Sequence, residues 1–430
     1  MNNENNIKGL NPFLPFGIYT ADGEPKVFGN RVYLYGSNDL FDGGYCSKEY
    51  HVYSAPVDDL TDWTDHGINF TTDAVPWSDA VLYAPDALLY NGVYYLFFCL
   101  SDGTEGVAES DRPEGPFVNA RRITLNGQPI TGIDPSVLED NGKIYYTWGQ
   151  FNLNMGELNE DMCTLKSETV RTGIITNEAG GEGFHEGSSL RKVGNKYCLI
   201  YASEYSADYP NNGARPTKLD YAVSDSPYGP YERRGTVIDN DGCDPETWNN
   251  HGSIIKINGE WFVFYHASSN SSAYSRRARA ERIRVDEENC VITQASPTSN
   301  GFQKALPAES IASPVNARRF YGGAYVTEKD GGFPAVGLKS GAGFSFGKAV
   351  YTQGDYKLAV ICRPLENGAV RFLIDDKTAA EIPFLKCDSL CELSARFTAH
   401  AGAHITEFAV SGAPDSDLAE IYSLKIEKTE

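Results

Sequence analysis

The sequence has 430 residues, of which 41% are hydrophobic and 22% charged, as in an ordinary soluble globular protein. Its formal net charge of −21 disfavours nucleic acid as a partner, because contacts to phosphate need a basic surface. No run of residues approaches the roughly 18 apolar positions of a membrane-spanning helix, so no membrane partner is expected; the oligomeric state stays open.

The N-terminal residues 1–16 contain no basic segment followed by an apolar one, so we expect no secretory leader and a cytoplasmic location. A leader that had been removed would leave the same sequence. The 9 cysteines are an odd number and are scattered, which favours reduced thiols. Cys387 and Cys391 are close, but no second pair accompanies them, so we do not infer a zinc site.

A repeated pattern organises the first three hundred residues. Each copy has a polar residue, a short apolar stretch, a turn rich in Gly and Asn, and an aromatic-rich strand. In chain order the copies are residues 21–35, 84–98, 133–148, 184–201 and 250–265. Asn-Gly between two such strands is a strong hairpin signal. A spacing of roughly 50–65 residues holds about four short strands, one propeller blade, so we expect an all-β, five-bladed β-propeller over residues 1–308.

The repeat stops near residue 307, and residues 310–316 read as a linker. Further strand-like segments follow, punctuated by turns: residues 356–362, 369–374, 405–410 and 421–426. Alternating apolar residues and frequent turns predict a β-sandwich over residues 309–430.

Four copies open on a polar residue at nearly the same offset before the turn: Asp22, Asp134, Glu186 and His251. Asp86 is slightly closer to its turn. If the first strand of each copy is innermost, these side chains meet at one end of the central axis. A single Asp before Pro or Gly more often caps a turn. Several polar residues in register favour a common site instead.

Carboxyl groups of this kind suit glycoside hydrolysis, in which one acid protonates the leaving oxygen and another activates water or attacks the sugar. Glu186 is the candidate acid, because glycine and serine around it leave room for a substrate. Asp22 is the candidate base, and Asp134 a neighbour that raises the pKa of the acid by charge repulsion. Glu24 competes with Asp22, since strand alternation puts both on the same side.

Two further residues are candidates for sugar binding. Trp77, just before the second copy, could stack on a sugar ring or pack in a loop. Gln150, after the third copy, could hydrogen-bond a hydroxyl group.

The chain resembles glycoside hydrolase family 43, the five-bladed hydrolases that include α-L-arabinofuranosidases and β-xylosidases. The resemblance covers about residues 10–300. It lies in these segments: residues 11–15, 20–22, 132–135, 185–189, 250–253 and 261–266. One departure is Asp22-Gly23-Glu24-Pro25, where the family commonly has Asp-Pro.

The resemblance implies that Asp22 is the base, Asp134 the modulator and Glu186 the acid. It places His251 on the axis, where it binds sugar or accompanies a structural calcium or waters. It also makes Arg276 a sugar contact, although a surface salt bridge is the alternative. No cofactor is required for the chemistry. The family is inverting, which implies about 6.5–9.5 Å between Asp22 and Glu186.

The expected function is therefore an exo-acting, inverting glycosidase acting on an oligosaccharide or polysaccharide and releasing a terminal pentose, first α-L-arabinofuranose. A β-D-xylosidase, a galactose-releasing hydrolase and a non-catalytic sugar-binding propeller are the alternatives. The C-terminal region resembles accessory carbohydrate-binding domains. It contains no Trp for sugar stacking, which favours a structural role.

Overall fold

The computed structural model describes residues 8–41, 43–176, 183–204, 217–242 and 250–429. The prediction of an all-β protein is confirmed, since helix in these residues is limited to short 3-10 turns. They are η1 (Thr72–Ala74), η2 (Ser167–Thr169), η3 (Ala308–Ser310) and η4 (Pro314–Asn316). None of the described helices has the length and apolar character needed to cross a membrane.

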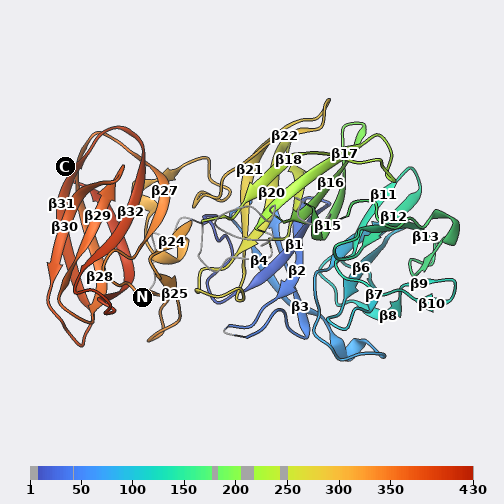
Figure 1. The fold of residues 1–430 in the computed structure, drawn as a ribbon, viewed down its shortest axis with the longest axis horizontal. Helices are drawn as coiled ribbons and strands as arrows, with labels where there is room; N and C mark the ends of the chain where they lie inside the picture. Colours follow the sequence, from blue (N-terminus) through green and yellow to red (C-terminus); the bar gives the residue numbers. More distant parts are fainter. Residues whose placement is uncertain (1–7, 42, 177–182, 205–216, 243–249, 430) are drawn as a thin grey trace.

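Residues 20–293 form five sheets that follow one another along the chain, here called the N-terminal lobe (Figure 1). The first contains β1 (Thr20–Phe28), β2 (Arg31–Asn38), β3 (Glu49–Pro56) and β4 (Thr64–Thr71). The second contains β5 (Asp86–Tyr90), β6 (Val93–Cys99), β7 (Glu105–Ser110) and β8 (Val118–Arg122).

The third sheet has six strands: β9 (Thr124–Leu125), β10 (Gln128–Pro129), β11 (Ser136–Asp140), β12 (Lys143–Trp148), β13 (Asn154–Leu158) and β14 (Thr164–Leu165). The fourth contains β15 (Phe184–Val193), β16 (Lys196–Ser203), β17 (Lys218–Ser224) and β18 (Glu232–Asp239). The fifth contains β19 (Ser253–Ile257), β20 (Glu260–Ala267), β21 (Arg277–Asp286) and β22 (Val291–Thr293).

The leading strand of each sheet's first hairpin faces its counterparts in neighbouring sheets. β1 contacts both β19 and β5, β11 contacts both β5 and β15, and the fourth sheet reaches the fifth through β16 and β19. Side chains join these strands: Ser189 Oγ lies 2.7 Å from Ser253 Oγ, and Asp86 Oδ2 accepts the Val137 N–H at 2.8 Å. The repeated hairpins therefore surround a common centre.

That centre contains two buried ion pairs as well as apolar side chains. Glu24 pairs with Arg191, and Lys26 Nζ lies 2.6 Å from Asp86 Oδ1. Each acid has a cation beside it, so the two negative and two positive charges cancel. Replacing one member of a buried pair usually costs more than the pair itself contributes, because it leaves an uncompensated charge.

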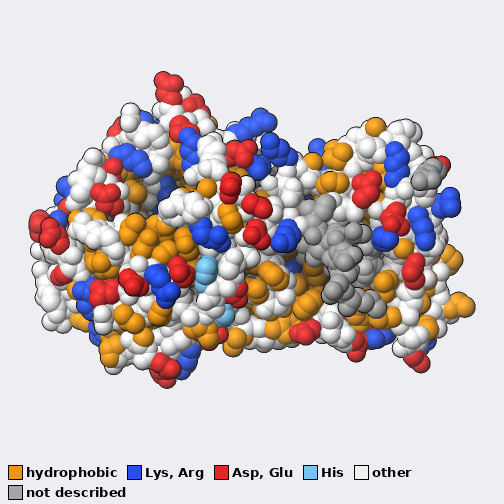
Figure 2. Space-filling model, turned by 180° about the vertical axis from the view of Figure 1, so that it is seen from behind, with side chains coloured by type: hydrophobic (Ala, Val, Ile, Leu, Met, Phe, Trp, Pro, Cys, Tyr) orange, Lys and Arg blue, Asp and Glu red, His pale blue; other side chains and the backbone are white. Residues whose placement is uncertain are grey.

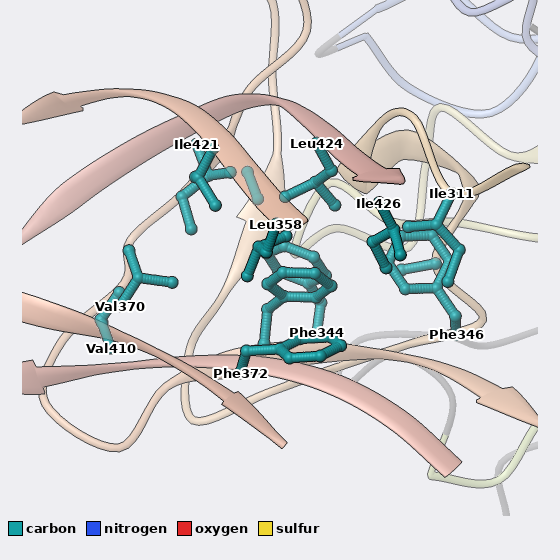
Figure 3. Packing of buried hydrophobic residues seen from close by; sticks show 14 of the residues in the cluster. Ile311, Phe344, Phe346, Leu358, Val370, Phe372, Val410, Ile421, Leu424 and Ile426 are labelled. Carbon is teal, nitrogen blue, oxygen red and sulfur yellow. The ribbon is translucent and has the colours of Figure 1, made fainter. Parts of the chain in front are cut away.

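Two further sheets form the C-terminal lobe. One contains β23 (Leu306–Pro307), β27 (Gly343–Tyr351), β32 (Gly402–Gly412), β29 (Gly368–Ile374) and β30 (Lys377–Phe384), with β24 (Arg319–Tyr321) paired to β27. The other contains β25 (Tyr325–Val326), β26 (Ala335–Val336), β33 (Ala419–Lys428), β28 (Gly354–Pro364) and β31 (Cys391–Ala399). Both sheets contribute to one apolar core, in which Phe344 and Phe372 face Leu358 and Leu424 (Figure 3).

The segment predicted as a linker, residues 310–316, is ordered by contacts with both lobes. It carries η4, and both η3 and η4 contact β33. Asn316 Nδ2 donates to Asn11 O at 3.4 Å. In the space-filling view the two lobes meet at a narrower waist, and acidic and basic side chains are interspersed over this face (Figure 2).

Candidate active site

One pocket lies where the first strands of the five sheets begin, and every one of these sheets or its preceding loop contributes to it. Its lining residues are Asp22, Tyr45, Cys46, Tyr83, Ala84, Ile133, Asp134, Gln150, His185, Glu186, His251 and Arg276. The cavity holds about 190 Å³, below the roughly 300–1,000 Å³ typical of sites for drug-sized ligands. A cavity of this size suits a single sugar unit.

Asp22 lies at a β-bulge of β1, where the pairing with β2 shifts between Ala21 and Glu24. Its backbone is left-handed, with φ of 54°. This turn directs the carboxylate toward the pocket, where it accepts hydrogen bonds from Ser37 Oγ and, at 2.8 Å, from Arg276 Nη1. A bulge is a common way to re-aim a side chain beside an active site.

Arg276 is 2% exposed and is fixed by two carboxylates. Its Nε and Nη2 donate to the two oxygens of Asp39 at 2.9 and 2.8 Å, which leaves Nη1 for Asp22. The guanidinium also lies 4.8 Å from the centre of the Tyr45 ring. Arg276 is therefore a buried clamp rather than the surface salt bridge considered above.

The protonation of Asp22 is decided by opposing effects. Burial raises its pKa, but the positive charge of Arg276, the histidines His251 and His266 and the Ser37 hydrogen bond together lower the pKa to about 2. Asp22 is thus ionised at any ordinary working pH.

Asp134 has the opposite character. It too has a left-handed backbone, with φ of 58°, and its Oδ2 accepts the Gly187 N–H at 3.0 Å. Burial and the negative charges of Glu186 and Asp22 raise its pKa well above the ordinary value, since the hydrogen bond from Gly187 only partly opposes them. The repulsion expected between these carboxyl groups therefore raises the pKa of Asp134 itself.

Glu186 lies on β15 between two register shifts of its pairing with β16. Its Oε2 accepts a hydrogen bond from Gln150 Nε2 at 2.7 Å and lies 3.6 Å from His185 Nε2. The other ring nitrogen of His185 is hydrogen-bonded to Glu204. Gln150 therefore contacts the candidate acid directly.

His251 lies between two carboxyl groups of the pocket. Its Nδ1 is 3.6 Å from Asp22 Oδ1 and 3.8 Å from Asp134 Oδ2. Calcium takes 6–8 oxygen ligands. In the described part of the chain no group of three or more His, Cys, Asp and Glu side chains is arranged to hold a metal ion. No calcium site at His251 is therefore found among the described residues, and no step below involves one.

Two predicted candidates lie away from the pocket lining. Glu24 is buried and pairs with Arg191 in the centre of the lobe. Trp77 packs against the core of the first two sheets, with its ring stacked 6.2 Å from that of Phe98 and beneath Arg122. The packed-loop alternative therefore describes the position of Trp77.

Several residues that line the pocket or contact its lining side chains were not singled out from the sequence. Asp39 orients Arg276, and His266 Nδ1 accepts the Asp22 N–H at 3.0 Å. Burial lowers the pKa of His266 to about 3, helped by Arg276, so the ring is neutral and can accept this hydrogen bond. Tyr45 and Tyr83 come from loops outside the repeat. Only the position of His266 within a family-like segment could have drawn attention to it.

Comparisons with known proteins identify the family of the chain. A family model described as glycosyl hydrolases family 43 matches residues 11–291. A xylosidase/arabinosidase of Thermoclostridium stercorarium is 33% identical over 332 residues, which cover 68% of this chain and 67% of that protein.

Solved structures show the same similarity. A β-xylosidase/α-arabinofuranosidase from a compost microbial metagenome, in complex with xylotriose, has a TM-score of 0.55 and 26% identity, covering 67% of this chain and 97% of that chain. An arabinoxylan arabinofuranohydrolase from Bacillus subtilis has a TM-score of 0.56 at 19% identity and covers 96% of each chain, a likeness of fold that spans both lobes.

Proposed function

The chain belongs to glycosyl hydrolases family 43 and is a glycosidase, and we propose that it is an exo-acting, inverting enzyme that releases a terminal pentose. The observation that carries the proposal is the meeting of Asp22, Asp134 and Glu186 in one pocket sized for a single sugar unit. The substrate is a plant-type oligosaccharide or polysaccharide that carries such a pentose at a chain end or branch.

In this proposal Asp22 is the base and Glu186 the acid. Asp22 stays ionised beside Arg276 and accepts a proton from the attacking water. A carboxylate with a pKa of about 2 is a weak base, but the transition state resembles an oxocarbenium ion, so water needs little proton removal. Glu186 donates its proton to the leaving oxygen. Gln150 holds the Glu186 carboxyl group through its hydrogen bond to Oε2. Asp134, whose pKa is raised by burial and by the charges of Glu186 and Asp22, lies near the acid and accepts the Gly187 N–H.

We propose that the five sheets of the N-terminal lobe are the blades of a five-bladed β-propeller over residues 1–308. The contacts among their first strands support this architecture. The two sheets of the C-terminal lobe then form a β-sandwich over residues 309–430, whose shared core supports the assignment.

α-L-Arabinofuranose is our first choice of released sugar, and β-D-xylose is the second. The names of relatives, which include a xylosidase/arabinosidase and a β-xylosidase, support β-D-xylose. Both sugars are pentoses, and the pocket volume accommodates either.

A panel of 4-nitrophenyl glycosides tests the proposal. We expect release from the α-L-arabinofuranoside or the β-D-xyloside, and the first product seen by NMR should have the inverted anomeric configuration. Retention would contradict the assignment of Asp22 as a base that activates water. Absence of release from every pentoside, including arabino- and xylo-oligosaccharides, would contradict the proposed substrate class.

A further inference from the structure

Phe151 stands out because its side chain is exposed while its backbone is strained. It is 43% exposed and has φ of 59°, a left-handed conformation that a bulky residue rarely adopts. Single exposed aromatic residues are common and need no explanation. Backbone outliers persist only where the surroundings impose them, and they cluster at functional sites.

The surroundings of Phe151 are the residues that hold the candidate acid. Its N–H donates to His185 O at 2.7 Å, and its ring meets the His185 ring edge-on with centroids 4.9 Å apart. The preceding residue, Gln150, donates to Glu186 Oε2. Phe151 is not among the residues lining the pocket, but Gln150 and His185 are, so it lies next to the lining residues that contact Glu186.

The position of the acid determines which part of a substrate passes Phe151. If Glu186 protonates the leaving oxygen, the departing sugar lies on the Glu186 side, and the sugar to be released occupies the pocket. Asp22, the candidate base, is bound instead by Arg276, whose guanidinium lies against Tyr45. An apolar ring beside the acid is therefore placed to contact the departing part.

We propose that Phe151 is the platform for the departing sugar, and that this sugar is a pyranose presenting a flat apolar face, as in a β-linked xylose chain. This inference rests on the proposed function and deepens it by naming the class of leaving group. The strained backbone holds the ring in place before substrate binds, so that little conformational freedom is lost on binding. Phe151 is a specificity-determining residue and takes no part in proton transfer.

Two substitutions test the contribution of the ring. Phe151→Gly removes both the ring and the strain, because glycine adopts positive φ freely. Phe151→Tyr keeps the ring. For Phe151→Gly we expect KM for xylo-oligosaccharide-based substrates to rise roughly 3- to 10-fold, with an unchanged inhibition constant for free pentose and a melting temperature no lower than that of the wild type. Phe151→Tyr should retain more of the xylo-oligosaccharide affinity than Phe151→Gly, because it keeps the ring. Leu385→Ala, at an exposed apolar residue of the C-terminal lobe, is the control and should behave as the wild type.

An unchanged KM for oligosaccharides in Phe151→Gly would overturn the inference. An equal rise in KM and in the pentose inhibition constant would also overturn it, because Phe151 would then act by shaping the pocket through His185. Calorimetry with xylotriose, carried out with and without the Phe151 substitution in a Glu186→Gln background so that the ligand is not cleaved, provides a readout that does not need turnover. If the wild type hydrolyses no glycoside, the proposed function fails, while weaker xylotriose binding with Phe151→Gly than without it would still support the platform and equal binding would refute it.

Discussion

Two of the three pocket carboxyl groups belong to residues with a left-handed backbone. Asp22 and Asp134 have φ of 54° and 58°; Asp22 lies within β1, and Asp134 lies just before β11. Aspartate tolerates this conformation better than larger residues, at a cost of order 1–3 kcal/mol. The backbone, rather than side-chain rotamers alone, therefore directs both carboxyl groups into the pocket.

The assignment of the base can be tested with an isosteric pair. Asp22→Asn should lower kcat about 10²–10⁴-fold on activated and unactivated substrates alike, because water loses its proton acceptor. Glu24→Gln should retain most of the activity of the folded protein but lower its melting temperature, since Arg191 would lose its charged partner. Steady-state kinetics and thermal melts of both variants test whether Asp22 or Glu24 is the base. Full activity in Asp22→Asn together with loss in Glu24→Gln would assign the base to Glu24.

Arg276 should control the acid limb of the pH profile. With its pKa at about 2, Asp22 should not limit kcat/KM above about pH 3. In Arg276→Gln the main effect that lowers this pKa is lost, while burial still raises it, so the acid limb should move up by about 1–3 pH units. Arg276→Lys keeps the charge and should move it less. If the acid limb of the kcat/KM profile lies at the same pH in Arg276→Gln as in the wild type, a group other than Asp22 determines it.

The sequence predicted the pocket residues that lie at equivalent points of the repeat: Asp22, Asp134, Glu186 and His251. Their equivalence is visible because each precedes its own hairpin. Asp39 and His266 lie on other strands or loops and reach Asp22 or Arg276 only when sheets distant in sequence come together. Trp77 was a candidate for sugar binding on its local sequence alone, and its packing on Phe98 depends on a core that no local pattern specifies.

At the level of elements, the start of β15 combines an acid, a glycine and two register shifts. Gly187 has φ of 66°, and a Cβ there would lie 2.9 Å from His251 Cγ. Gly187→Ala should therefore displace His251 and disturb the hydrogen bond to Asp134, lowering kcat at least about tenfold. Gly259→Ala is the matched control, since its φ of 84° imposes similar strain but a Cβ meets open space.

Both glycine variants should lose roughly 1 kcal/mol of stability, and only Gly187→Ala should lose activity. Equal activities in the two purified, folded variants would mean that the approach of Gly187 to His251 is unimportant for turnover.

Hairpins were predictable from sequence where turn chemistry was explicit. Asn91-Gly92, Asn141-Gly142 and Asn258-Gly259 all have positive φ at both positions, as a tight hairpin turn requires. The two-residue strands β9, β10 and β14 were not foreseen, because two residues cannot display a periodicity. The linker expected at residues 310–316 proved to be packed, since its contacts come from β33, over a hundred residues later.

For the whole molecule, the C-terminal lobe touches the strand that begins beside Arg276. Arg277 donates to Ser269 Oγ and, at 3.3 Å, to Val315 O. Val326 N–H donates to Ser269 O at 2.7 Å. The loop before Arg276 is thus held by the C-terminal lobe, which gives that lobe a role in positioning the clamp on Asp22.

Arg277→Ala should weaken this hold. We expect a loss of about 2–4 kcal/mol of stability, because hydrogen bonds to a buried charge are removed, and an upward shift of the acid limb smaller than in Arg276→Gln. Denaturant unfolding and kcat/KM profiles measure both. The exposed Arg284 on the same strand provides the control, since Arg284→Ala should change neither. If Arg277→Ala loses stability but its kcat/KM pH profile does not shift, the C-terminal lobe has only a structural role.

The ion pair between Asp22 and Arg276 joins residues 254 positions apart. At roughly 5–20 residues per second, a ribosome needs on the order of 10–50 s to add the arginine after the aspartate. Throughout that interval β1 can pair with β2, but its carboxylate lacks the guanidinium that binds it in the folded pocket. The nascent chain therefore acquires catalytic competence late and abruptly, when the fifth sheet emerges, and chains released before that point would carry the carboxyl groups without a working pocket.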